Sequence, residues 1–211
     1  MKNWYTETQS LPSRAIEVIP PYLPVSNSPR AVVQPPIIGF AAYDFDVKGG
    51  PILLEAFKLV RQVYPDCILH IVGSTPRLTP AEARRGNIIW ESAVDRVKLL
   101  DVILPELTVF AYPTKFDGLP LILLDVLSLG IPSVCSNYPP ITELVEHEVD
   151  GLICDTDKPR ELADNIIRLL DPNVNARYSE QIRRRFRERF SSDAVKPQLS
   201  TVYTRVANKV P

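Results

Sequence analysis

Histidine is almost absent from this chain, whose 211 residues include only two, His70 and His147. An imidazole-rich metal site or a histidine-based catalytic triad would require both residues to meet through folding. The scarcity of histidine therefore disfavours both kinds of site.

The chain also lacks a net charge, a long apolar run and a regular cysteine pattern. Its 24 basic and 25 acidic residues nearly cancel, so no overall field draws it to nucleic acid or an anionic membrane. No run of 18 apolar residues predicts a transmembrane segment, and the N-terminus does not resemble a signal peptide. The three cysteines, Cys67, Cys135 and Cys154, are odd in number, form no CxxC and lie in apolar stretches. We expect reduced core thiols in a cytoplasmic protein.

A length of 211 residues allows one full domain, or one domain with a tail, and excludes a large two-domain enzyme that closes over its substrate. Proline is abundant, at 21 residues against only 8 glycines, and it is concentrated at the N-terminus. We therefore predict a proline-rich arm over residues 1–36, with one candidate strand at 15–19. The folded domain is predicted over residues 37–207.

Short apolar runs alternate with segments of helical periodicity from residue 37 onward, which predicts repeated strand–helix units. The expected strands are 37–42, 67–72, 87–90, 107–111, 132–135 and 152–154. The expected helices are 51–63, 79–86, 94–100, 119–129, 142–146, 159–170, 174–190 and 193–207. This order indicates an α/β fold, a single Rossmann-like doubly wound and mainly parallel sheet with helices on both faces.

Loops that follow strands are the expected binding segments, because ligands of such sheets bind beyond the carboxyl ends of the strands. In the loop 43–50, Lys48 and Gly49 stand just before a helix, where backbone amides and a formal charge favour an anion. An ordinary surface turn is the competing interpretation.

Two aspartates mark a second loop, in the segment 115–130. Asp117 stands where a helix N-cap is expected, and a plain cap is one interpretation of it. Asp125 falls inside an otherwise apolar helix, where a carboxylate is costly unless something satisfies it. The carboxylate of Asp125 must therefore bind a ligand, lie on an exposed face of the helix, or pair with a structural partner such as an arginine. Eight helical residues separate the pair by roughly 12 Å, beyond the ~5 to 9.5 Å of paired glycosidase carboxylates.

The run from Phe116 to Leu170 resembles the donor-binding domain of the group 1 (family 4) glycosyltransferases, retaining enzymes of the GT-B architecture with two Rossmann domains. Their signature is an acidic residue, seven residues, a second acidic residue and then a Gly-x-Pro turn into a strand. Asp117 and Asp125 occupy the acidic positions, and residues 130–132 supply the turn. The resemblance covers roughly residues 37–207.

This resemblance implies a role for each matching position. Lys48, with Gly49, would hold the donor diphosphate, Asp125 would accept hydrogen bonds from the ribose hydroxyls, and Asp117 would face the sugar near its reacting carbon. Backbone amides would meet sugar or phosphate oxygens at Gly118, Leu119, Ile141 and Thr142. No cofactor and no metal are implied, since the nucleotide-diphospho-sugar is a substrate whose leaving diphosphate is neutralised by cations and helix N-termini.

Three departures from the family pattern keep a second function open. Ala42 and Tyr43 stand where the family has glycine and arginine, Pro139 and Pro140 replace a glycine-rich turn, and both acidic residues are aspartate. The chain is therefore either a glycosyltransferase donor domain or a non-catalytic nucleotide-sugar-binding module or partner subunit with a decayed site. Another type of α/β enzyme finds no support, because GxSxG, GxGxxG and GxxxxGK[ST] are all missing.

Two features of the sequence indicate which partners to expect: the length of the chain and the arginines near its C-terminus. Enzymes of the resembled family place the acceptor in a separate N-terminal domain, so we expect a second polypeptide, or a second copy, to supply that domain and an unknown acceptor. The helix at 174–190 carries several arginines around an apolar line. This pattern favours a solvated amphipathic helix over a nucleic-acid or membrane-surface helix, although peripheral membrane association stays open.

Overall fold

A single parallel sheet organises this chain, whose computed structural model describes residues 16–24, 33–73 and 78–208. All strand pairs are parallel, and the spatial order is β3-β2-β1-β4-β5-β6. The strands are β1 (Ile37–Ala42), β2 (Ile68–Gly73), β3 (Ile88–Ser92), β4 (Val109–Tyr112), β5 (Ser133–Ser136) and β6 (Leu152–Cys154). This order is that of a Rossmann-like doubly wound sheet, which confirms the predicted fold class.

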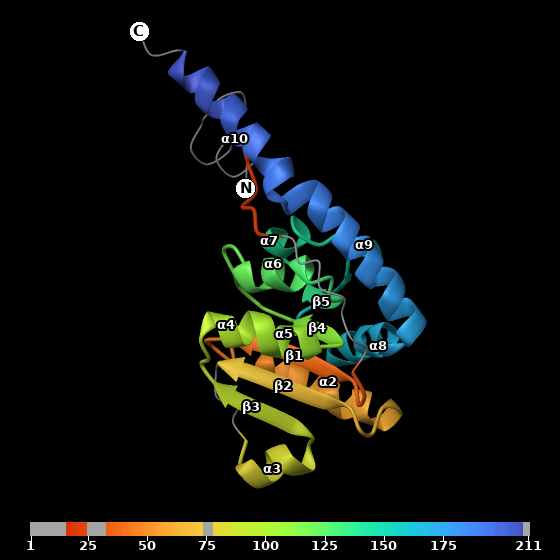
Figure 1. The fold of residues 1–211 in the computed structure, drawn as a ribbon. Helices are drawn as coiled ribbons and strands as arrows, with labels where there is room; N and C mark the ends of the chain where they lie inside the picture. Colours follow the sequence, from red (N-terminus) through yellow and green to blue (C-terminus); the bar gives the residue numbers. More distant parts are fainter. Residues whose placement is uncertain (1–15, 25–32, 74–77, 209–211) are drawn as a thin grey trace. The chain divides into compact units, whose positions relative to one another are not determined.

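Helices cover both faces of the sheet (Figure 1). The helices of the described chain are α2 (Gly50–Val63), α3 (Pro80–Arg85), α4 (Arg96–Lys98), the π-helix η2 (Leu99–Ile103), α5 (Leu104–Glu106), α6 (Leu121–Ser128), α7 (Pro139–Thr142), α8 (Pro159–Leu170), α9 (Pro172–Phe190) and α10 (Ser192–Ala207). Helix α2 packs against α8. In Figure 1, α4 and α5 lie on the near side of β1, and α2 lies on the far side.

The described residues form two compact units, each considered by itself. One lies within 26–183 and contains the whole sheet, and the other combines residues from 1–25 with residues from 184–211. In the second unit, the backbone amide of Leu23 donates to the carbonyl of Phe190 at 3.1 Å, and Arg205 forms an ion pair with Glu17. The division into an arm at 1–36 and a domain at 37–207 stays a prediction.

Local sequence signals set several helix ends. The predicted capping box at α3 is present, because the Thr79 hydroxyl accepts from the amide of Glu82 and the Glu82 carboxylate accepts from the amide of Thr79. Asp171 ends α8 and accepts from the amides of Asn173 and Val174, so it also fixes the start of α9. Short-range chemistry of this kind is readable from the sequence.

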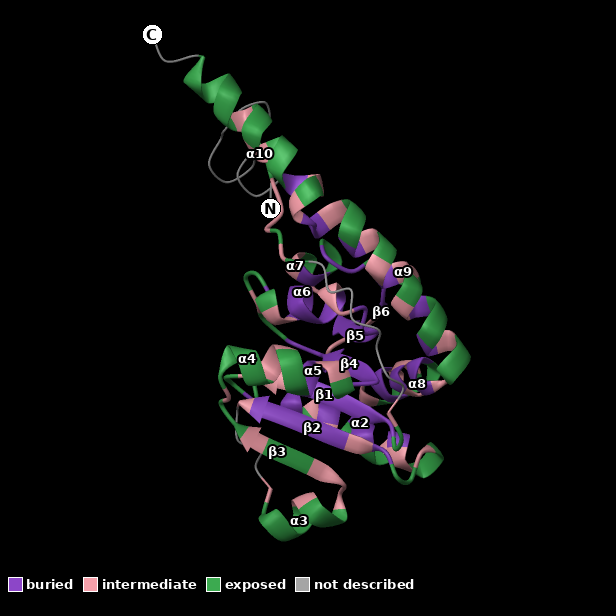
Figure 2. Cartoon of the chain, viewed as in Figure 1, coloured by how far each residue is buried: buried purple, intermediate pink, exposed green. Residues whose placement is uncertain are grey.

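The sheet interior is almost entirely apolar, and β3 is the half-exposed edge strand (Figure 2). Phe40 packs edge-on against Phe45, which folds the loop after β1 back onto the sheet. The three cysteines are buried and unpaired, as expected, and burial raises the pKa of the Cys67 thiol to about 12. Within the described residues, every helix falls short of the length and apolar character that a bilayer-spanning segment needs.

The helix predicted at 94–100 runs instead from Arg96 to Glu106, as α4, η2 and α5 in succession. Three further predictions need correction because of proline. The part of the candidate strand 15–19 that is described, 16–19, is not a strand, and prolines follow it directly. Helix α6 starts at Leu121 and not at 119, since Pro120 pushes the preceding residue toward extended backbone. Helix α7 covers 139–142 in place of 142–146, because its two prolines fit the first helical turn.

Asn175 in α9 links two elements of the core, and its removal is predicted to destabilise the chain. Its buried side-chain amide donates to the carbonyls of Thr108 at 3.0 Å and Leu169 at 2.8 Å. Asn175→Ala leaves both carbonyls without this donor, so we expect the free energy of unfolding to fall by about 2 kcal/mol in urea denaturation.

Tyr178, one turn further along α9, provides the matched control. It is equally buried, but its hydroxyl has no hydrogen-bond partner among the described residues. Tyr178→Phe removes only that hydroxyl and is expected to leave the stability equal or slightly higher. Equal losses in the two variants would contradict the role given to Asn175.

Candidate functional site

A cavity of about 460 Å³ lies at the carboxyl ends of the central strands. Its walls come from the carboxyl ends of β1, β2 and β4 and from the segments that follow β1, β3 and β4. This is where the strand order reverses and where such sheets bind ligands. Four of the predicted site residues meet there: Asp117, Leu119 and Asp125, which are neighbours in sequence, and Lys48, which is 69 residues before Asp117.

Gly49 lets the loop after β1 close against the loop after β4. Its φ is 82°, and a Cβ at this position would lie 2.0 Å from the carbonyl oxygen of Pro113. The amide of Lys115 donates to the carbonyl of Val47 at 3.0 Å and ties the two loops together. A glycine is therefore required here by both backbone conformation and space.

The amides before α2 are already used inside their own loop, contrary to the free amides that the sequence led us to expect. Those of Lys48, Gly49 and Gly50 donate to the carbonyls of Asp44, Asp46 and Phe45. The capacity of this loop to bind an anion therefore falls mainly on the Lys48 ammonium.

Lys48 and Asp117 form an ion pair across the cavity. The Lys48 Nζ lies 2.6 Å from Asp117 Oδ2 and 2.8 Å from the carbonyl oxygen of Phe116. The Tyr112 hydroxyl donates to the same Asp117 oxygen. An ammonium has three N–H donors, so one donor of Lys48 stays available to the cavity beyond these two bonds.

Asp117 is held in its charged form. Partial burial opposes its ionisation, but hydrogen bonds from Lys48, Tyr112 and the amide of Gly118 outweigh burial and hold the pKa of Asp117 below its ordinary value. The plain helix-cap interpretation is wrong, because α6 begins at Leu121 and no side chain caps it.

Asp125 has the arginine partner that the sequence left open. Arg96 Nη2 lies 2.7 Å from Asp125 Oδ1, and Arg96 Nη1 lies 3.0 Å from Asp125 Oδ2. The carboxylate is buried, whereas the side chain of Arg96 is 59% exposed. Burial raises the pKa of Asp125, and the arginine opposes this shift without cancelling it. The two carboxylates of one cavity thus have pKa values shifted in opposite directions.

Four predicted donor-binding positions, Gly49, Gly118, Ile141 and Thr142, do not line this cavity. The amides of Ile141 and Thr142 both donate to the carbonyl of Tyr138, within the first turn of α7. Thr142 instead borders a separate recess beside His147. The roles that the resemblance gives to these amides, and to Gly118, stay predictions.

The two histidines do not meet. His70 Nε2 lies 3.0 Å from a Glu91 carboxylate oxygen, and His147 Nδ1 accepts from the amide of Ile153. Over the described ranges, no group of three or more histidine, cysteine, aspartate or glutamate side chains is arranged to hold a metal ion.

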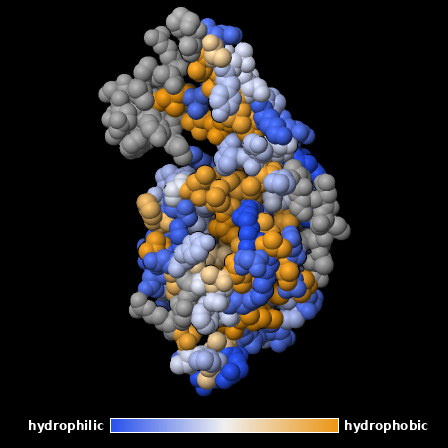
Figure 3. Space-filling model, turned by 60° about the vertical axis from the view of Figure 1, so that its left-hand side comes forward, coloured by the Kyte–Doolittle hydropathy of each residue, from blue (hydrophilic) through white to orange (hydrophobic). Residues whose placement is uncertain are grey.

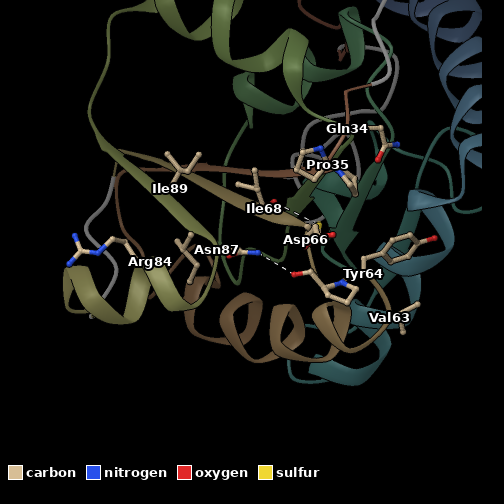
Figure 4. Close-up of a pocket in the computed structure, with 13 residues that line it drawn as sticks. Gln34, Pro35, Val63, Tyr64, Asp66, Ile68, Arg84, Asn87 and Ile89 are labelled. Atoms are coloured by element: carbon tan, nitrogen blue, oxygen red, sulfur yellow. Dashed lines mark hydrogen bonds between the residues drawn. The ribbon is translucent and has the colours of Figure 1, made fainter.

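A larger recess, of about 890 Å³, opens at the amino ends of the strands (Figure 4). It is lined mainly by apolar side chains and backbone, with Asn87 donating to the carbonyl of Pro65 at 3.1 Å. Its lining includes the charged residues Asp66 and Arg84 only. Size alone therefore does not locate the site, because the convergent charges lie at the opposite end of the sheet.

The mouth of the 460 Å³ cavity has an apolar rim. Figure 3 brings the side at the carboxyl ends of β2 and β3 forward and shows apolar side chains interleaved with hydrophilic ones. The exposed rim residues that line the cavity are Tyr43, Leu119 and Leu121. Tyr43, at 95% exposure, occupies the position where the resembled family has arginine.

Comparison with known proteins places this chain in a family. The sequence model described as "Glycosyl transferases group 1" matches residues 35–172. The chain belongs to the group 1 glycosyltransferases. A glycosyltransferase of Haemophilus influenzae is 26% identical over 144 residues, which are 66% of this chain and 41% of the relative. This glycosyltransferase chain thus spans about two fifths of that relative's length.

Solved structures share the fold. A glycosyltransferase from Rickettsia africae superposes with a TM-score of 0.77 at 15% identity and covers 99% of this chain and 62% of its own. Anabaena HepE, solved in complex with UDP-glucose, has a TM-score of 0.64 at 19% identity and covers 80% of this chain and 48% of its own. Both likenesses place this chain among the GT-B folds.

The sequence did not single out Arg96 or Tyr112. Arg96 follows Asp95, whose side chain accepts from the amide of Lys98 and starts the helical segment. Tyr112 ends β4, five residues before Asp117. The only feature of the sequence that indicates a role for Tyr112 is its hydroxyl group at the carboxyl end of a central strand. No short-range sequence pattern predicts the pairing of Arg96 with Asp125, which is 29 residues away.

Tyr112→Phe is predicted to raise the pKa of Asp117 toward its ordinary value. The substitution removes one hydrogen bond to the carboxylate and keeps the buried ring. The measurement is an NMR titration of the Asp117 carboxyl carbon. Tyr43→Phe, on the exposed rim, serves as control and should leave the titration unchanged, and an unaltered midpoint in Tyr112→Phe would refute the bond.

Proposed function

We propose that this chain is the donor-binding domain of a hexosyltransferase that takes a nucleotide-diphospho-sugar and transfers the sugar with retention of configuration. The observation that carries the proposal is the convergence of Lys48, Asp117 and Asp125 on one cavity at the strand-order reversal. Its volume of about 460 Å³ falls within the 300–1,000 Å³ that is common for small-molecule sites. The HepE complex with UDP-glucose supports the ligand class through the shared fold.

Lys48 is the proposed diphosphate ligand. Its ammonium keeps one N–H for the cavity, and its charge is only partly exposed, so an anion placed there would meet little competition from water. As the bond between sugar and diphosphate breaks, negative charge grows on the leaving group, and a fixed cation stabilises that change.

Asp117 is the proposed group beside the reacting carbon. Its pKa lies below the ordinary value, so the carboxylate is charged at neutral pH. Both Lys48 and Tyr112 bond to Oδ2, and the amide of Gly118 also donates to this carboxylate. A carboxylate held this way would stabilise the positive charge that develops on the sugar ring as the diphosphate departs.

Asp125 is the proposed ribose ligand. A carboxylate accepts about four hydrogen bonds, and Arg96 supplies two of them. Two acceptor directions are thus left for a vicinal diol. Since the cavity supplies the cationic side chains of Lys48 and Arg96 to balance the charge of the diphosphate, we further propose that transfer requires no metal ion and no cofactor.

The proposed transfer also needs a domain that binds the acceptor. The chain covers 41% of the Haemophilus relative, so more than half of that relative's length has no counterpart here. We propose that an acceptor-binding domain, on a second polypeptide or a second copy, completes the enzyme.

A non-catalytic nucleotide-sugar-binding module is the second candidate. It is favoured by Tyr43 in place of a phosphate-binding arginine and by the internal pairing of both carboxylates with cations. The open cavity beside Lys48 argues against a site that has been filled by the chain's own side chains.

Donor binding is measured directly by calorimetry with UDP-, GDP- and ADP-sugars. We expect at least one donor to bind the wild type, and Asp125→Ala to weaken that binding at least tenfold through loss of about 1.5–3 kcal/mol of hydrogen bonds to a charged group. A chelator should leave the affinity unchanged. Failure of every donor to bind would falsify the proposed function.

Transfer tests the need for an acceptor domain. The purified chain alone is expected to transfer little sugar to any acceptor in a product assay, because only one wall of the active site is supplied. Addition of a separate acceptor-binding domain should restore turnover. Robust transfer by the chain alone would overturn this part, and donor binding without transfer under both conditions would favour the non-catalytic module.

A further inference from the structure

Arg96 reaches the cavity from the segment after β3, which was not among the loops predicted to bind the donor. It opens α4, directly after the N-cap Asp95, and the π-helical turn η2 follows within three residues. Arg96 lines the cavity together with Lys48 and Asp117. The segment after β3 therefore contributes a second cation to the site.

The geometry of the Arg96–Asp125 pair is directional. Each terminal nitrogen of the guanidinium faces a different carboxylate oxygen, at 2.7 and 3.0 Å, and this planar fork fixes the orientation of the carboxylate. Asp125 is 4% exposed and sits in an apolar helix, so its charge has no comparable support from water. The charged and titratable groups that share its cavity are Arg96, Lys48, Asp117, Tyr43 and Tyr112.

Arg96 also has donors to spare. A guanidinium carries five N–H groups, and two of them bond to Asp125. Within the described part of the chain the other three have no protein acceptor, and the side chain is 59% exposed. These donors leave Arg96 able to contact a ligand in the cavity while it holds Asp125.

We propose that Arg96 is a positioning residue of the donor site, which holds the Asp125 carboxylate ionised and oriented so that it accepts the ribose hydroxyls of the nucleotide sugar. This inference rests on the proposed function and deepens it, since it adds a residue on which donor affinity and its pH dependence rely. Burial raises the pKa of Asp125 and Arg96 opposes that shift, so loss of the arginine raises the pKa further.

The pH dependence follows from the sign of these shifts. The ionised carboxylate accepts the diol, so donor affinity falls as the pH drops through the Asp125 pKa. In Arg96→Gln the pKa is higher, so the fall begins at a higher pH than in the wild type. A loss of packing alone would weaken binding without moving this midpoint.

The experiment is calorimetric titration of UDP-, GDP- and ADP-sugars across pH 5–8, with folding checked by circular dichroism. Arg96→Gln is expected to bind the donor about tenfold more weakly at neutral pH, with its acid limb moved to higher pH. Arg96→Lys keeps the charge but loses the fork, so we expect weaker binding with an acid limb near that of the wild type. Asp125→Asn cannot ionise and should lose the limb.

Lys98→Gln is the matched control. Lys98 lies on the same short helix and carries the same charge, but it pairs with Glu91 outside the cavity, so its loss should change neither affinity nor pH profile. If Arg96→Gln binds the donor with the affinity and the pH dependence of the wild type, the role proposed for Arg96 is overturned, and the proposed function of the chain still stands. If that variant does not fold, wild-type affinity in Arg96→Lys overturns it. Absence of donor binding by the wild type overturns the proposed function and this inference with it.

Discussion

The parallel pairing of β1 with both β2 and β4 is the constraint on which the site depends. The chain builds β2 and β3 on one side of β1 and then returns across β1 to build β4, β5 and β6 on the other side. A crevice is therefore left between the carboxyl ends of β1 and β4. Gly49 then allows the two loops to close to contact distance. The cavity is a consequence of this topology, and its charged side chains are positioned by backbone hydrogen bonds between the loops.

Charge compensation is the second organising feature. Lys48 neutralises Asp117, and Arg96 neutralises Asp125, so both carboxylates stay within a largely apolar fold without an unpaired buried charge. The surroundings differ, however. Asp117 accepts from several donors and its pKa is lowered, while Asp125 is more deeply buried and its pKa is raised. Two side chains of the same type are thereby suited to different tasks in one cavity.

Much of the fold was predictable because its signals are local. Alternating apolar runs located all six strands, and the capping box at Thr79 located α3 within one residue. The errors arose where proline acts on its neighbours, as at Pro120, which delays α6 and frees Asp117 from a capping role. The resemblance to the glycosyltransferases selected Lys48, Asp117 and Asp125, which do meet, and also Ile141 and Thr142, which line no part of the same cavity.

The sequence by itself determined the helices, the strands, the family and the placement of two carboxylates and a lysine in loops after strands. Only the tertiary structure decided which groups pair. Lys48 and Asp117 are 69 residues apart, and Arg96 and Asp125 are 29 apart. Hydrogen bonds at such separations depend on how the elements pack in the folded chain, so no local propensity encodes them. Two further partners were for this reason visible only in the folded chain: Tyr112, which acts with Lys48 to lower the pKa of Asp117, and Arg96, which opposes the rise that burial causes in the pKa of Asp125.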